Sequence, residues 1–149
     1  MKLPEPMLIA FEEAEAAAVR GEVPVGAVVA DARGRIIARA GNRTLELKDP
    51  TAHAEMLAIR TAAAVLGSER LNDCDLHVTL EPCAMCAGAI SFARIRRLYF
   101  GAADEKMGAV EHGSRFFAQA TCHHRPDVYS GFGEDQAREL LREFFKSRR

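Results

Sequence analysis

The chain has 149 residues, a formal net charge of −1 and a pI near 6.5. Hydrophobic residues make up 48% of the sequence and charged residues 28%, which is the balance of one globular domain with its own core. No apolar run approaches the length of a membrane span, and the near-neutral charge gives no sign of a general nucleic-acid binder. Since the N-terminus also lacks a signal-peptide pattern, we expect a cytoplasmic protein whose four cysteines are metal ligands or free thiols.

The first part of the chain is expected to fold as a helix followed by a β-hairpin. Residues 5–20 carry apolar side chains at helical spacing, and Gly21 follows them as a natural end of the helix. A β-branched run at residues 23–30, a short turn and a second run at residues 35–40 predict two antiparallel strands.

The middle of the chain alternates helices with strands. A helix at about residues 52–66 is followed by an alternating strand at residues 75–80, a second helix at 83–93 and an apolar strand at 95–101. A helix placed between two strands implies that these strands are parallel neighbours.

The last third of the chain has a looser pattern. Residues 104–125 look like a long loop, residues 127–129 like a short edge strand, and residues 134–149 like a final amphipathic helix with a basic end. The order of elements predicts one α/β domain over residues 1–149, with three α/β/α layers and a mixed central sheet.

Two short motifs predict a zinc site: His53-Ala54-Glu55 and Pro82-Cys83-Ala84-Met85-Cys86. A His-x-Glu motif followed by Pro-Cys-x-x-Cys is the pattern of zinc-dependent nucleobase deaminases. His53, Cys83 and Cys86 supply three ligands, the number that a catalytic zinc takes from protein, whereas a structural zinc takes four. Cysteines three residues apart at the start of a helix lie on one face, and the helix N-terminus favours their thiolate form.

Glu55 is expected to lie beside the metal rather than to bind it. Two residues along a helix from His53, it points to a different side. There it can take a proton from a zinc-activated water and pass it to the substrate. The alternative is a structural zinc with a fourth protein ligand, which would leave Glu55 without a role. The candidates for this fourth ligand are Cys74, His77, Cys122 and His123.

These motifs resemble the cytidine deaminase-like zinc deaminases and, among them, the bacterial tRNA-specific adenosine deaminases, or TadA family. The stretches that carry the resemblance are residues 22–28, 41–43, 49–55, 78–89, 94–95, 100–102 and 144–149. The chain departs from the family pattern at His77, where an aromatic residue is expected, and in residues 107–129.

The resemblance implies a five-stranded mixed sheet between helices, a homodimer, and one zinc ion per chain. It implies deamination of adenosine to inosine at the wobble position of a tRNA anticodon stem-loop, of the tRNA-Arg type, with no nucleotide cofactor. It assigns His53, Cys83 and Cys86 as zinc ligands, Glu55 as the proton shuttle and Asn42 as a contact to the target nucleoside.

Several roles remain open at this level. Asn42 is also an ordinary turn residue, and the backbone N–H of Ala54 is placed to reach a base. Glu81 braces a loop, contacts substrate or is simply exposed at the surface. The basic run at residues 146–149 suits phosphate contacts or a solvated face. Two rival functions are a deaminase of guanine, cytosine or cytidine with the same zinc motifs, and a catalytically silent RNA-binding or scaffold module.

Overall fold

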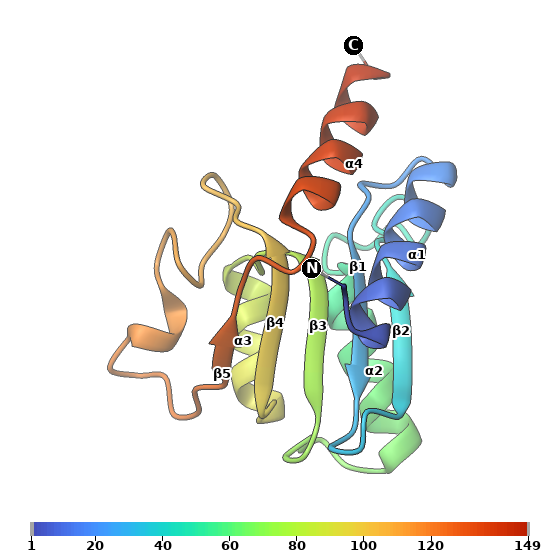
Figure 1. The fold of residues 1–149 in the computed structure, drawn as a ribbon. Helices are drawn as coiled ribbons and strands as arrows, with labels where there is room; N and C mark the ends of the chain where they lie inside the picture. Colours follow the sequence, from blue (N-terminus) through green and yellow to red (C-terminus); the bar gives the residue numbers. More distant parts are fainter. Residues whose placement is uncertain (1, 149) are drawn as a thin grey trace.

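The computed structural model describes residues 2–148 and has the expected three-layer α/β architecture, with one five-stranded sheet between two layers of helices (Figure 1). Arg149, expected in the last helix and in the basic run, lies outside the described residues. The elements in chain order are α1 (Glu5–Val19), β1 (Gly26–Ala30), β2 (Ile36–Gly41), α2 (Ala54–Leu66), β3 (Asp75–Leu80), α3 (Ala84–Ala93), β4 (Arg97–Ala102), a 3₁₀ turn η1 (Phe116–Ala118), β5 (Asp127–Tyr129) and α4 (Glu134–Lys146).

The sheet is mixed, with strand order β2-β1-β3-β4-β5. Strand β1 runs antiparallel to both β2 and β3, whereas β3, β4 and β5 are parallel to one another. The predicted hairpin and the predicted parallel pair around α3 are therefore both present. Helix α1 lies on one side of the sheet and α2 and α3 on the other, whereas α4 extends beyond the carboxyl ends of β3 and β4 (Figure 1). The carboxyl ends of β3 and β4 consequently meet at one edge, where ligands bind in open α/β sheets.

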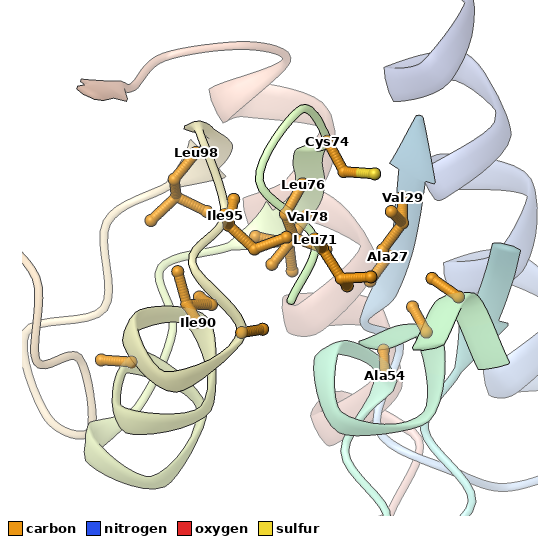
Figure 2. Close-up of a cluster of buried hydrophobic side chains, with 14 of the residues drawn as sticks. Ala27, Val29, Ala54, Leu71, Cys74, Leu76, Val78, Ile90, Ile95 and Leu98 are labelled. Carbon is orange, nitrogen blue, oxygen red and sulfur yellow. The ribbon is translucent and has the colours of Figure 1, made fainter. Parts of the chain in front are cut away.

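The larger hydrophobic core fills the space between the sheet and helices α2 and α3. Figure 2 shows Leu76 and Val78 of β3 inside this core, between Ile90 of α3 and Ala54 of α2. All four of these residues have no exposed surface. Because side chains alternate along a strand, His77 points to the opposite face.

Glycine at position 26 allows α1 to pack directly onto β1. A Cβ atom at this position would lie 1.8 Å from the backbone oxygen of Ala10 and 2.7 Å from the backbone nitrogen of Ala14. Any larger side chain would force the helix away from the strand. The small core under α1, which includes Met7 and Phe11, depends on this contact.

Several elements begin later than the sequence pattern predicts. Strand β1 starts at Gly26 instead of residue 23, because Pro24 has no N–H to donate to a sheet. Helices α2 and α3 start at Ala54 and Ala84, so His53 and Cys83 are their extended N-cap residues. No helix within residues 2–148 combines the length and apolar character needed to cross a bilayer.

Candidate metal centre

The N-termini of α2 and α3 bring His53, Cys83 and Cys86 together. Nδ1 of His53 lies 3.6 Å from the Sγ atom of each cysteine. The three candidate ligand atoms all lie within 4.8 Å of one another. Cys83 caps α3 and Cys86 lies in its first turn, so one short motif presents both sulfur atoms to the histidine of the other helix.

One nitrogen and two sulfur donors fit a zinc ion with an open coordination position. Zinc prefers these ligand types, and three protein ligands are typical of its catalytic sites. Within residues 2–148, no other group of three or more histidine, cysteine or acidic side chains is close enough to hold a metal. The proposed fourth ligands of a structural zinc, which were Cys74, His77, Cys122 and His123, do not join the cluster. The structural-zinc alternative is therefore wrong for these residues.

Hydrogen bonds within the cluster shift the pKa values of all three candidate ligand side chains. A hydrogen bond with Cys86 lowers the pKa of the Cys83 thiol to about 4, and the same contact raises the pKa of Cys86. A hydrogen bond with Cys83 also raises the pKa of His53. Because zinc binds thiolates and neutral imidazole, its binding at this cluster must release protons.

Glu55 lies beside the cluster, in the first turn of α2. Only 4% of its surface is exposed, and this burial raises the pKa of its carboxyl group to about 7. A hydrogen bond from its own backbone N–H and the charge of His53 both lower this pKa, but by less than burial raises it. A carboxyl group with a pKa near neutrality can both accept and donate a proton under physiological conditions.

Asn42 and Ala54 contact each other across the site. The Oδ1 atom of Asn42 accepts a hydrogen bond of 2.8 Å from the backbone N–H of Ala54. The Asn42 backbone is itself held, since its N–H donates to Val25 and its oxygen accepts from Arg20. The Ala54 N–H, which we expected to reach a base, is therefore occupied by Asn42, and the side-chain NH₂ group of Asn42 is left for a ligand.

A pocket of about 240 Å³ opens over these groups. It is smaller than the roughly 300–1,000 Å³ of sites for drug-sized ligands, which suits a compound with one base-sized ring system. The residues that line it are Val23, Val25, Asn42, Thr44, His53, Glu55, Leu80, Glu81, Cys83, Asp104 and Met107.

Comparison with known proteins agrees with this geometry. Residues 2–102 match the family model described as the cytidine and deoxycytidylate deaminase zinc-binding region. The tRNA-specific adenosine deaminase of Agrobacterium fabrum is 62% identical over 143 residues, which cover 96% of this chain and 93% of that protein. The chain belongs to the TadA family of cytidine deaminase-like proteins.

Solved structures similar to this TadA-family chain include a tRNA deaminase and a guanine deaminase. A structure from a study of A-to-I editing by tRNA:A34 deaminases at the wobble position has a TM-score of 0.89 and 62% identity, and covers 91% of this chain and 98% of its own. The guanine deaminase of Nitrosomonas europaea has a TM-score of 0.77 and 28% identity, over 97% of this chain and 85% of its own. The shared fold is therefore found with both RNA and small-molecule specificity.

The sequence motifs of this TadA-family chain account for the chemical groups of the site but not for its walls. The structure brings together the predicted residues His53, Glu55, Cys83 and Cys86, with Asn42 at the same pocket. Thr44, Asp104 and Met107 also line the pocket, and no sequence motif predicts them because each lies in an irregular segment. The aromatic pair Phe116 and Phe117 lies outside this pocket, with Phe117 in the main core and Phe116 packed against it.

Proposed function

We propose that this chain is a zinc-dependent hydrolytic deaminase that converts adenosine to inosine at the wobble position of a tRNA anticodon. The observation that supports this function most directly is the position of buried Glu55 next to the His53, Cys83 and Cys86 cluster in one pocket. The RNA substrate follows from the high identity to tRNA-specific adenosine deaminases.

In this reaction Glu55 moves the protons. When bound, zinc supplies Lewis-acid chemistry that makes water nucleophilic near neutral pH. The Glu55 carboxylate takes a proton from the attacking water and delivers it to N1 of the adenine ring. Glu55 then takes the remaining proton of that water from the new C6–OH group and delivers it to the amino nitrogen N6, so that the C6–N6 bond breaks, ammonia leaves and the C6=O group of inosine remains. The side-chain NH₂ group of Asn42 donates to the nucleoside and holds it in place.

A larger groove next to the pocket supports a polymeric substrate. It has a volume of about 970 Å³ and shares Val23, Leu80, Asp104 and Met107 with the site pocket. Helix α4 and the segment after β4, which border it, lie at the same edge of the sheet (Figure 1). Its lining includes three basic side chains, Lys106, Arg138 and Arg148, and two acidic ones, Asp104 and Glu105.

Two of these basic side chains are available for phosphate groups. Lys106 and Arg148 form no ion pair within residues 2–148, whereas Arg138 pairs with Glu134. The guanidinium carbon of Arg148 lies 4.0 Å from the centre of the Phe144 ring, which holds this side chain over the groove. A free nucleobase would not need these two basic side chains, whereas the phosphates of nucleotides on either side of a target base would.

The remaining parts of the proposal concern assembly and location. Helices α2 and α3, on the same side of the sheet, expose large apolar side chains: Val65 is 62% exposed, Leu66 45% and Phe92 83%. We assign this surface to a homodimer, since burial of such side chains favours association. We also assign the protein to the cytoplasm, where tRNA is modified.

The test is an inosine assay on an arginine-tRNA anticodon stem-loop with adenosine at the wobble position. Guanine, adenosine and cytidine are assayed in parallel. We expect inosine only in the stem-loop, and a kcat lowered by about 10²–10⁴ in Glu55→Gln at unchanged zinc content. Arg148→Ala should raise KM for RNA, whereas Arg33→Ala, which removes an exposed arginine of the β1–β2 turn, should not.

Other outcomes would favour the rival functions. Turnover of guanine, cytosine or cytidine with the stem-loop unchanged would replace the RNA substrate by a small molecule. RNA binding by zinc-loaded protein without turnover of any substrate would support the silent binding module.

A further inference from the structure

A buried carboxylate at the end of β3 holds the long segment between β4 and β5. The side chain of Glu81 has no exposed surface. Its Oε1 atom accepts hydrogen bonds from the backbone N–H of Asp104 at 3.0 Å and from Nδ1 of His112 at 2.8 Å. Its Oε2 atom accepts from the backbone N–H groups of Val110, Glu111 and His112 at 3.1, 2.9 and 3.1 Å. The two Glu81 oxygens therefore accept five hydrogen bonds, all from residues 104–112.

The same segment closes tightly around this carboxylate. A Cβ atom on Gly108 would lie 2.5 Å from Oε2 of Glu81 and 2.4 Å from the backbone oxygen of Asp104. The backbone N–H of Ala109 donates to the oxygen of Pro82 at 2.9 Å. Residues 104–112 therefore pack directly against the turn that carries the two cysteine ligands.

This packing decides the shape of the substrate site. Asp104 and Met107, which belong to the segment, line both the small pocket and the larger groove. Glutamate is required at position 81, because only a carboxylate has two acceptor oxygens for these five donors. In glutamine, the NH₂ group would replace one oxygen and would face N–H donors from which it cannot accept a hydrogen bond.

We propose that Glu81 is a positioning residue that holds residues 104–112 as the wall between the base pocket and the groove for flanking nucleotides. It acts through Asp104 and Met107 and does not contact the reacting atoms. The role of the groove rests on the proposed RNA substrate, but the ordering of the segment by Glu81 does not.

The test compares Glu81→Gln with Glu22→Gln. Glu22 is also buried, but its carboxylate accepts the N–H groups of Leu45 and Glu46 and so holds a different loop. In zinc-loaded Glu81→Gln we expect the amides of residues 110–112 to exchange with solvent about 100-fold faster, with α2 and α3 unchanged. Glu22→Gln should instead speed exchange at residues 45–46 and leave residues 110–112 protected.

A kinetic measurement separates positioning from general destabilisation. For the stem-loop, Glu81→Gln should raise KM about tenfold while kcat changes less than about threefold, at unchanged zinc content. Normal exchange at residues 110–112 would overturn the proposal, and so would a lower kcat with an unchanged KM.

A second variant, Gly108→Ala, tests the same proposal if Glu81→Gln does not fold or loses zinc. Gly108→Ala places a methyl group against the Glu81 carboxylate and replaces none of the three candidate metal ligands. It should give the same faster exchange and the same rise in KM, and wild-type behaviour would overturn the proposal. Hydrogen exchange needs no substrate, so a failure of the RNA assay and a failure of this inference are distinguishable.

Discussion

Lowering the pH from 7 to 5 should destabilise the folded protein by about 2 kcal/mol through one side chain, His77. His77 lies on β3, is 6% exposed, and stacks on Tyr99 with ring centres 4.6 Å apart. Its Nδ1 atom is buried and has no hydrogen-bond partner among residues 2–148. Burial lowers the pKa of this imidazole to about 4, although the nearby charge of Asp75 acts in the opposite direction.

The size of the effect follows from the two pKa values. The unfolded chain binds a proton at His77 near the ordinary pKa of 6.5, whereas the folded protein does so only near 4. Protonation between these values favours the unfolded state, so stability is full above pH 6.5 and falls as the pH falls toward 4. The complete loss is about 3 kcal/mol, of which about 2 kcal/mol occurs between pH 7 and pH 5.

In the described part of the chain, no acidic side chain forms an ion pair with His77. The charged side chains that share its shallow hollow are Asp31, Asp75, Arg96 and Arg97. Asp75 is paired with Arg96 at 2.8 Å, so its carboxylate is already engaged.

The assay is denaturant unfolding of wild type and His77→Phe at pH 7 and pH 5, at equal zinc content. Phenylalanine keeps the stack on Tyr99 and removes the titrating ring, so the pH-dependent loss should be about 2 kcal/mol smaller in the variant. Other titrating groups, including the metal ligands, are common to both proteins and cancel in this difference. Equal losses in the two proteins would refute the reasoning.

Three other substitutions test the packing and the site. Gly26→Ala should lower stability by about 3 kcal/mol in thermal melts, because its Cβ would overlap α1, whereas Gly88→Ala, with its nearest neighbour 3.9 Å away, should not. Cys86→Ser should reduce bound zinc by elemental analysis, and a chelator should abolish wild-type turnover until zinc is restored. Asn42→Asp keeps the acceptor for Ala54 but loses the NH₂ donor, so kcat/KM should fall about tenfold or more at normal stability.

The sequence predicted the chemistry of the site because that chemistry is encoded locally. The Pro-Cys-x-x-Cys motif places two sulfur atoms within one helical turn, and His-x-Glu places a carboxyl group two residues from a candidate metal ligand. The order of helices and strands was also readable from hydrophobic periodicity, and it gave the three-layer fold and the parallel pair β3 and β4.

Element boundaries were less predictable, for a physical reason. His53 and Cys83 have extended backbone and precede their helices as N-cap residues, and hydrophobic periodicity does not distinguish an N-cap residue from the first helical one. Likewise, Pro24 has no donor for the sheet, so β1 is shorter than its β-branched run.

By itself the sequence determined which groups can bind zinc and carry protons, because those depend on residue type and short spacing. Only the tertiary structure decided which distant residues form the pocket around them. Asn42 reaches Ala54 because the end of β2 meets the start of α2, and Glu81 takes up donors 23 to 31 residues further along the chain. Such contacts depend on how strands pair and how loops pack, which no local pattern specifies.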